Sequence, residues 1–366
     1  MDTLAADLIN AANRNAAKLP AVSDFKLKWQ SEAGLFFAGL TLPIPGTGTR
    51  LSAVDTANIL RVLGEISTDG GFNFSMAAHL FAGVIPVGGH GQNPVHLDAL
   101  HKVETGAIFA NAMTETSSGS DAFRMKTTAV RKGKEFVING SKTFVTNGPI
   151  ADYFVLYTMT DTAKGFFGGV TCFLLDKSKH TIGFGSVIEK NCLKNSPMCE
   201  LYFENCTVGE EYIIGQEGGG AMIFMESMDW ERACIAAMHA GTISRLLLNA
   251  SMYIKGRTLS GDKRLANLQA VQFKIADIAV LAETSRLMAQ RAAHQLDLKT
   301  GTVAAAQAKI MVSESLMQAA NLAATVMGGN GITAASGLTD VLADAQAALI
   351  YSGPNDVLRE LIASRL

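Results

Sequence analysis

The sequence is poor in charge and in cysteine, and it contains no long apolar run. Charged residues make up 17% of its 366 positions and hydrophobic residues 48%, whereas a typical soluble protein is about 25% charged. This deficit predicts that much of the surface is buried between subunits. No stretch approaches the roughly 18 uninterrupted apolar residues of a membrane span. The start of the chain carries the acidic Asp2, unlike a secretory signal. We therefore expect a cytoplasmic protein without a membrane partner.

Several kinds of site are excluded by what the sequence does not contain. The five cysteines form no C-x-x-C pair and have no paired histidines nearby, so no metal site is expected; they are Cys172, Cys192, Cys199, Cys206 and Cys234. No G-x-G-x-x-G follows an expected strand, which argues against a Rossmann nucleotide-binding domain. A net charge of −2 without a basic cluster gives no reason to expect nucleic acid as a partner.

Hydrophobic periodicity divides the chain into three parts. Residues 1–105 follow helical spacing. Residues 106–216 contain short strand-like runs at close spacing, which is typical of a compact barrel or sandwich. Residues 217–366 hold four long segments rich in alanine and methionine, a pattern typical of an antiparallel bundle. We predict an α+β protein with an N-terminal helical domain, a middle β-barrel domain and a C-terminal four-helix bundle.

The stretch from residue 111 to 149 carries the densest set of candidate ligand contacts. It opens with TETSSGSD at residues 114–121, a turn-rich segment dense in hydroxyls. Such a segment also offers several backbone N–H groups at once, which suits a phosphate, a pyrophosphate or a heteroaromatic edge.

Two hairpin signals follow this segment. The polar turn RKGK at residues 131–134 lies between β-like runs and predicts a hairpin, and Asn139-Gly140 predicts a second one. Beyond it, Phe144 and Thr146 share one strand face, so that an aromatic plane and a hydroxyl point the same way. Taken alone, each hairpin is better explained as an ordinary β surface than as a ligand site.

Together, the string MTE-x-x-S-GSD and the later NGSKTFVTN resemble the acyl-CoA dehydrogenase family, which binds FAD. The resemblance extends from about residue 20 to the C-terminus and implies the same three-part architecture. It also implies which side chains line the isoalloxazine ring and the start of the phosphate chain of FAD. These are Met113, Thr114, Ser120, Phe144 and Thr146.

A flavin dehydrogenase that acts on an acyl thioester must supply a base for the α-proton. Most members of the family carry this base in a Tyr-Glu-Gly-Thr sequence near the C-terminus, where this chain has Tyr351-Ser352-Gly353-Pro354. A minority carry it in the first bundle helix, at the position of Glu231. We predict that Glu231 is the catalytic base, with its pKa raised by apolar neighbours. The alternative is that Glu231 is a salt-bridged helix residue beside an arginine.

The resemblance implies further contacts. The substrate or Glu231 is expected to be held by Asp229, Arg232 and Ser352. The remaining FAD contacts are expected at Arg257, which reaches into a second subunit, and at Gly328, Gly329 and Gly353. The chain departs from the family pattern at Thr325, Ala343 and Pro354, where a glutamine, an arginine and a threonine are usual. These losses are expected to weaken FAD contacts at the subunit interface.

The combination of Trp-Glu-Arg at residues 230–232 with Tyr-Ser-Gly at 351–353 resembles one subgroup of the family. Its members act in secondary metabolism on acyl or aminoacyl groups held by a carrier protein, as in the conversion of prolyl to pyrrolyl. We predict FAD-dependent α,β-dehydrogenation of such a thioester, on a carrier protein rather than on CoA. Two alternatives remain, a flavin monooxygenase or oxidase on the same fold and a degenerate partner subunit.

Overall fold

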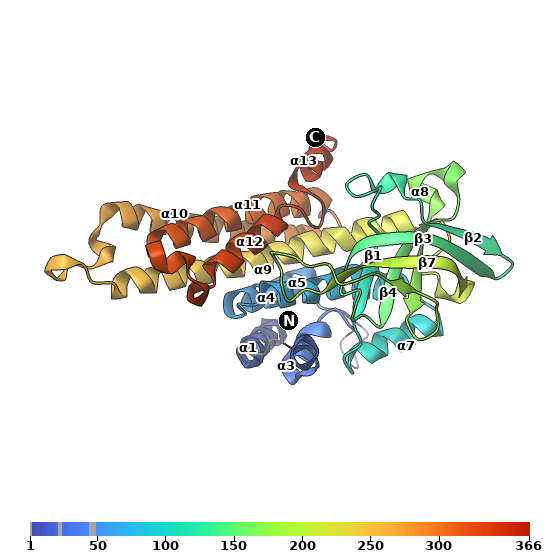
Figure 1. Ribbon diagram of the computed structural model, residues 1–366, viewed down its shortest axis with the longest axis horizontal. Helices are drawn as coiled ribbons and strands as arrows, with labels where there is room; N and C mark the ends of the chain where they lie inside the picture. The colour runs from blue at the N-terminus through green and yellow to red at the C-terminus, as the bar shows by residue number, and fades with distance from the viewer. Residues whose placement is uncertain (1, 21–23, 44–48) are drawn as a thin grey trace.

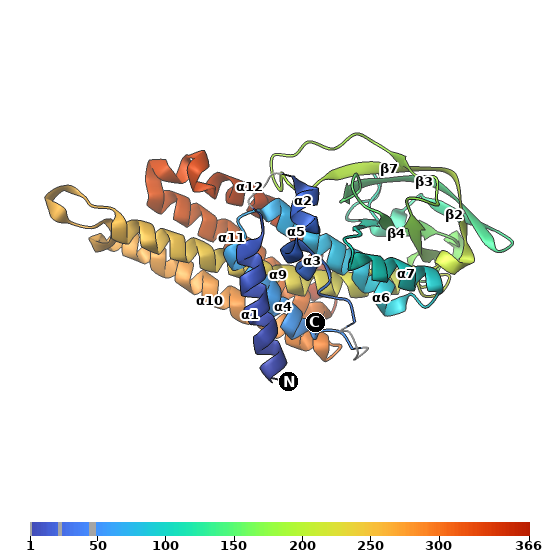
Figure 2. The same cartoon turned by 90° about the horizontal axis from the view of Figure 1, so that it is seen from below.

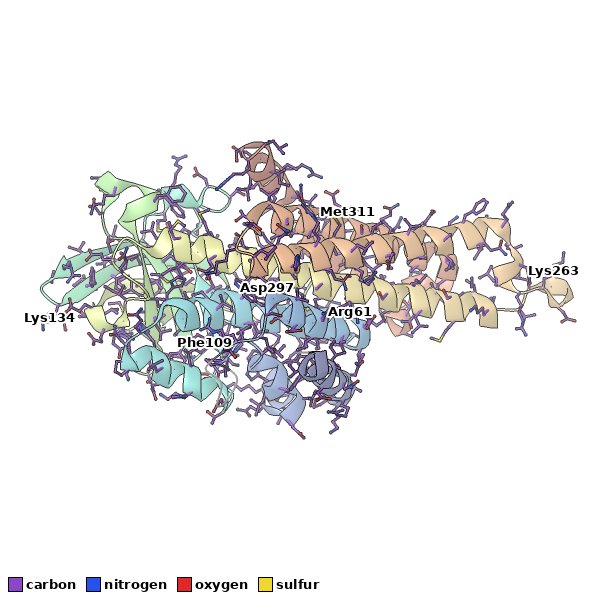
Figure 3. The ribbon with its side chains drawn as sticks, turned by 180° about the vertical axis from the view of Figure 1, so that it is seen from behind. Arg61, Phe109, Lys134, Lys263, Asp297 and Met311 are labelled. Atoms are coloured by element: carbon purple, nitrogen blue, oxygen red, sulfur yellow. The ribbon has the colours of Figure 1, made fainter. Side chains whose placement is uncertain are left out.

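The computed structural model describes residues 2–20, 24–43 and 49–366. The molecule is elongated, with a β-sheet at one end and long helices at the other (Figure 1). Lys134 lies at the tip of the sheet, and Lys263 lies at the opposite tip, where two long helices are connected (Figure 3). The predicted architecture of helical, β and helical parts is present in this order along the chain.

The N-terminal region is helical, as predicted. Its elements are α1 (Asp2–Lys18), α2 (Phe25–Gln30), α3 (Glu32–Ala38), α4 (Ala53–Ile66), α5 (Gly70–His79), the π-helix η1 (Leu80–Val84), α6 (Ile85–His90) and α7 (Pro94–Val103). Helix α4 packs against α9 and α10 of the bundle, α1 packs on α4 and runs across the long axis of the bundle, and α6 and α7 lie beside the sheet (Figure 2). The first turns of α2, α3, α4 and α5 are capped by the side chains of Asp24, Ser31, Ser52 and Asp69.

Helix α4 approaches the first bundle helix so closely that only glycine fits at the contact. A Cβ atom on Gly64 would lie 1.9 Å from the carbonyl oxygen of Met238, and one on Gly241 would lie 2.0 Å from that of Arg61. Larger side chains at these positions would push the helices apart. The N-terminal helices and the bundle therefore form one packed body.

The stretch Gly70–His90 is long and apolar enough, by length and composition, to cross a membrane, yet 94% of its most apolar window is buried inside the protein. Within it, His79 is fully buried between two other segments. Its Nδ1 accepts the backbone N–H of Phe109 at 3.0 Å, and its Nε2 lies 3.2 Å from the carbonyl of Ala38. Burial lowers the pKa of His79 to about 3. His79 is thus a core histidine whose two ring nitrogens both have partners.

The middle region is one curled sheet, as expected for a compact β domain. Its strands are β1 (Phe109–Ala112), β2 (Thr128–Lys132), β3 (Glu135–Thr146), β4 (Tyr153–Met159), β5 (Val170–Asp176), β6 (Gly183–Phe184) and β7 (Met198–Gly209). Their order in the sheet is β1-β4-β2-β3-β7-β6, with β5 paired to β4. Strands β2 and β3 form the hairpin predicted at residues 131–134.

The second predicted hairpin, at Asn139-Gly140, is wrong. Strand β3 runs through both residues without turning, because β7 pairs with it on either side of them. The ladder shifts register between Ile138 and Gly140, and Gly140 has φ +142°. Asn139-Gly140 therefore forms a β-bulge that bends β3, and Gly140 adopts the positive φ in this bulge.

The C-terminal region is a bundle built around one very long helix. α9 (Gly220–Gly256) has 37 residues and reaches from the sheet to the far end of the molecule, about 55 Å at 1.5 Å per residue. The other three predicted helices are α10 (Gln269–Asp297), α11 (Thr302–Met327) and α12 (Leu338–Ala348). A fifth helix, α13 (Asn355–Ala363), lies across α11 beside the sheet end of α9 (Figure 1). The predicted domain limits at residues 105 and 216 stay predictions.

Candidate active site

Glu231 lies on the buried side of α9 and keeps only 5% of its surface exposed. Its Oε1 accepts a hydrogen bond from Oγ of Ser352, on the turn that follows α12. Burial, the largest influence, raises the pKa of Glu231, and the Ser352 hydroxyl opposes that rise. A desolvated carboxylate that is not tied up by a cation is a good proton acceptor.

The arginine next to Glu231 has other partners. Nη1 of Arg232 lies 3.3 Å from Oδ1 of Asp229, and its Nε donates to the carbonyl oxygen of Ser352 at 2.9 Å. Asp229 also accepts a hydrogen bond of 2.6 Å from the hydroxyl of Thr302. Within the described residues, no cation lies at ion-pair distance from Glu231. The salt-bridged alternative for Glu231 therefore has no support in the geometry.

The turn at residues 351–354 is held in an unusual backbone conformation. Ser352 has φ +56° and Gly353 has φ +92°, and a left-handed backbone is unfavourable for a residue that carries a Cβ. The carbonyl of Ser352 is held by Arg232, and that of Gly353 accepts a hydrogen bond of 2.9 Å from Nζ of Lys309 on α11. Two buried cations thus fix the turn that brings Ser352 against Glu231.

Aromatic rings close the bundle side of this site. Tyr351 lies beside Phe74 of α5 with ring centroids 4.3 Å apart, and its hydroxyl lies 2.5 Å from Nε2 of His239. Burial lowers the pKa of His239 to about 4, so its imidazole is neutral near pH 7. Trp230 stacks on Phe81 at 6.5 Å. Tyr351 thus places an aromatic ring next in sequence to Ser352, the hydrogen-bond partner of Glu231.

On the sheet, the residues expected to contact flavin lie close to one another. The backbone N–H of Thr143 donates to the carbonyl of Thr114 at 2.8 Å, which places the 113–114 segment beside β3. A register shift between Lys142 and Val145 turns Phe144 outward, with φ +53°. Its ring is 60% exposed. An exposed aromatic face beside hydroxyls fits a planar heteroaromatic ring such as flavin.

A buried ion pair lies behind this surface. Nζ of Lys142 lies 2.8 Å from Oε1 of Glu115 and also donates to the carbonyl of Met113 at 2.9 Å. The Glu115 carboxylate accepts the backbone N–H groups of Lys126 and Thr127, at 2.7 and 3.0 Å. Lys142 and its partners therefore anchor the 113–115 segment to β3.

The other FAD contacts expected from the sequence do not join this group. Arg257 ends α9 at the tip that also carries Lys263. Gly328 and Gly329 lie at the same end, because Tyr253 of α9 contacts Met327 and Asn330 on either side of them. A Cβ on either glycine would meet no atom within 4 Å. Ser120 lies in an exposed turn after Ser118, on the sheet side.

Sequence reasoning missed Lys309, Lys142 and Glu115. Lys309 shares α11 with one other charged residue, Glu314, and a lone lysine among alanines and methionines was the available signal. Lys142 and Glu115 stand inside the two motifs that carry the family resemblance, but 27 positions separate them. Nothing in their spacing indicates that they meet.

The fold and the site together define a class of protein. A helical domain, a curled sheet and a helical bundle occur together with a desolvated carboxylate on the bundle and a flavin-compatible surface on the sheet, as in flavin-dependent dehydrogenases of acyl thioesters. The comparisons with known proteins are specific: residues 110–206 match the acyl-CoA dehydrogenase middle domain, and residues 218–366 match the acyl-CoA dehydrogenase C-terminal domain. The chain belongs to the acyl-CoA dehydrogenase family.

Two curated relatives show the range of activities nearby. The chain is 36% identical to an L-prolyl-[peptidyl-carrier protein] dehydrogenase of Serratia sp., over 92% of this chain and 88% of the relative. It is 35% identical to a cyclohex-1-ene-1-carbonyl-CoA dehydrogenase of Geobacter metallireducens, over 87% of this chain and 83% of the relative. The first is named for a carrier-bound substrate and the second for a CoA thioester.

Solved structures support the same family. PigA, in a complex with FAD and proline, superposes with a TM-score of 0.92 at 33% identity, over 99% of this chain and 97% of PigA. The prolyl acyl carrier protein oxidase AnaB superposes with a TM-score of 0.92 at 28% identity, over 99% and 98% of the two chains. The family is FAD-dependent and oxidises CH–CH bonds, so the predictions of family, fold, enzyme class and cofactor are confirmed.

Proposed function

We propose that this protein uses FAD to dehydrogenate an acyl or aminoacyl thioester at its α and β carbons, with Glu231 as the general base. The observation that carries the proposal is the buried Glu231 carboxylate, which is bonded to Ser352 and not to Arg232. Desolvation raises its pKa, which makes it a stronger base for a weakly acidic C–H bond.

The residues of this chain would divide the work as follows. Glu231 takes the α-proton on its carboxylate, and Ser352 holds that carboxylate in place. Arg232 and Asp229 fix the turn and the helix around it. Met113, Thr114, Phe144 and Thr146 would hold the flavin ring, and Ser120 the start of the phosphate chain. When bound, FAD supplies the acceptor for the β-hydrogen as hydride, which leaves the α,β double bond.

A tethered carrier-protein substrate is favoured over free CoA. The Trp-Glu-Arg and Tyr-Ser-Gly motifs resemble those of carrier-protein dehydrogenases. The Serratia relative is named for a prolyl group on a carrier protein, and PigA was solved with FAD and proline. An acyl group delivered on a phosphopantetheine arm needs no adenine site on the enzyme. The acyl group itself is proposed to be small, prolyl or a similar ring.

A second copy of the chain would complete the FAD site. Arg257, Gly328, Gly329 and the peptide after Gly353 are the expected family contacts, and the first three lie at the far end of the bundle from Phe144. They would therefore serve FAD held mainly by another subunit of a homodimer or homotetramer. Pro354 offers no N–H to this contact. We expect the assembly to function in the cytoplasm.

An oxidase is the second candidate, because AnaB, named a prolyl acyl carrier protein oxidase, is 28% identical over nearly the whole chain. The two candidates share the proton abstraction by Glu231 and differ in what reoxidises the flavin. Molecular oxygen would do so in an oxidase, and a separate electron acceptor in a dehydrogenase.

One experiment tests the substrate and separates these candidates. The purified protein is mixed without oxygen with one acyl group, prolyl, presented first on a carrier protein and then on CoA, and flavin bleaching is followed by stopped flow. We expect bleaching with the carrier-bound group and little with CoA. Air is then admitted, and fast recovery of the yellow colour with hydrogen peroxide release identifies an oxidase. Equal or faster bleaching with the CoA thioester would contradict the proposal that the substrate is bound to a carrier protein. A protein that remains colourless with added FAD would contradict the proposal that it is a flavin enzyme.

A further inference from the structure

Lys309 is a buried lysine for which the proposed chemistry has no role. It lies in the middle of α11, with 2% of its surface exposed. Its Nζ donates to the carbonyl oxygen of Gly353 at 2.9 Å and to Oδ1 of Asn355 at 2.8 Å. Burying an ammonium group is costly unless acceptors surround it. Its position therefore needs an explanation beyond packing.

The acceptors of Lys309 belong to the turn that carries Ser352. Asn355 begins α13, and its Nδ2 donates to Ser313 and Glu314 of α11, each at 3.1 Å. Its backbone N–H bonds the carbonyl of Leu349 at 3.1 Å. Through Gly353 and Asn355, Lys309 ties the segment that follows Ser352 to α11. This restrains the left-handed backbone of Ser352, which would otherwise relax.

The positive charge of Lys309 also acts on the carboxylate of Glu231. The charged or titratable groups that interact with this ammonium group electrostatically are Glu231, Arg232 and His239 from α9 and Glu314 from its own helix. Glu314 is already paired with Arg359 of α13. The positive charge of Lys309 lowers the pKa of Glu231, in the same direction as Arg232. Burial and then Arg232 lower the pKa of Lys309 itself to about 7, so Lys309 is charged below about pH 7.

We infer that Lys309 is a positioning residue of the active site: it holds the Ser352 turn against Glu231 and, through its charge, keeps Glu231 ionised. This inference rests on the proposed role of Glu231. Lys309 would thus have two roles that substitutions can separate. Holding the turn requires a hydrogen-bond donor, and keeping Glu231 ionised requires a positive charge.

The test uses three substitutions at this position in the full-length protein. Lys309→Met removes both donor and charge, Lys309→Gln keeps a donor without charge, and Lys309→Arg keeps both. The rate of flavin reduction is measured against pH. We expect Lys309→Met and Lys309→Gln to lose activity at a pH roughly one unit higher than the wild type does on acidification. A shift of about one unit is what the loss of a nearby opposite charge does to the pKa of a carboxyl group. Lys309→Arg is expected to lose activity at the same acidic pH as the wild type, so that the acid limb of its pH–rate profile is unchanged.

Lys28 provides the matched control. It is a second buried lysine, on α2, and it pairs with Asp69 at 2.7 Å. Lys28→Met is expected to lower the melting temperature without moving the acid limb. If Lys309→Met and Lys309→Gln lower the melting temperature in the same way and leave the acid limb where it is, Lys309 is only structural and the inference is overturned. Should Lys309→Met not fold, Lys309→Gln and Lys309→Arg decide between the same outcomes.

A second readout does not depend on activity. The C=O stretch of protonated Glu231 is taken from infrared difference spectra between each protein and its Glu231→Gln counterpart, and is titrated with pH. We expect this titration to move to higher pH in Lys309→Met and Lys309→Gln. If it moves while flavin reduction is unaffected by Glu231→Gln, the proposed base is wrong but the coupling to Lys309 stands. If it does not move, the inference fails whatever the rates show.

Discussion

The two halves of the candidate site use buried charge differently. On the bundle, Glu231, Asp229, Arg232 and Lys309 are buried at the place where the proposed reaction occurs, and burial shifts the pKa of each. On the sheet, the side chains predicted to hold the flavin ring (Met113, Thr114, Phe144 and Thr146) carry no charge, and the supporting segment contains the buried ion pair of Lys142 and Glu115. The proposed reactive groups lie where desolvation can shift their pKa values, whereas the buried ion pair of the sheet half only anchors the segment that would bind flavin.

The largest effect is expected when the Glu231 carboxylate of the bundle half is replaced. Glu231→Gln is nearly isosteric, so the fold and the bound flavin should be kept. Flavin reduction by substrate should fall by roughly 10²–10⁴-fold, the usual loss for a missing general base. Stopped-flow bleaching measures this directly. Bleaching at the wild-type rate would show that the base lies elsewhere.

The same variant tests the electrostatic side of the comparison. A carboxyl group whose pKa is raised by folding stabilises the protein while it is protonated, and this contribution is lost as pH rises through the folded pKa. At pH 8, Glu231→Gln should therefore unfold at the same or a higher temperature than the wild type. A clear drop in its melting temperature at this pH would mean that the ionised carboxylate is stabilised by its surroundings.

The sheet half is broken by removing its internal support. Lys142→Met leaves the Glu115 carboxylate buried without its cation, which typically costs about 3–5 kcal/mol. Urea denaturation should show this loss, and flavin should dissociate more readily because Met113 loses its anchor. Lys164→Met is the control, since its pair with Asp161 is exposed and worth about 1 kcal/mol or less. Equal effects of the two substitutions would contradict a supporting role for Lys142.

The smallest effect is expected at the contact between the turn and the base. Ser352→Ala should leave flavin reduction within about tenfold, or ~1.4 kcal/mol, because the hydroxyl only positions Glu231. Since this hydroxyl lowers the pKa of Glu231, its loss should move the acid limb of the rate to higher pH. Ser244→Ala, farther along α9 with a hydroxyl bonded to Ala240, should move nothing. A loss as large as that of Glu231→Gln would place the serine in the chemistry.

Local sequence signals were most informative where a motif or a period repeats without help from distant segments. The long alanine- and methionine-rich segments predicted the four long helices of the bundle, because a helix repeats the same local hydrogen bonds along its whole length. The polar turn at residues 131–134 predicted its hairpin for a similar reason. Asn139-Gly140 has equally strong turn chemistry, but β7 pairs with β3 on both sides of it. The long-range ladder overrode the local preference.

The sequence by itself determined which chemical groups were available: a glutamate in the first bundle helix, a serine where the family usually has its base, and an aromatic residue with hydroxyls on one strand. Only the tertiary structure decided which of them meet. Glu231 and Ser352 are 121 positions apart, and Lys309 is 44 positions from Gly353. The pKa of Glu231 depends on burial, on the Ser352 hydroxyl from the turn after α12, and on the charges of Arg232 and of Lys309 on α11. Desolvation is a property of the packed assembly, so no local pattern encodes it.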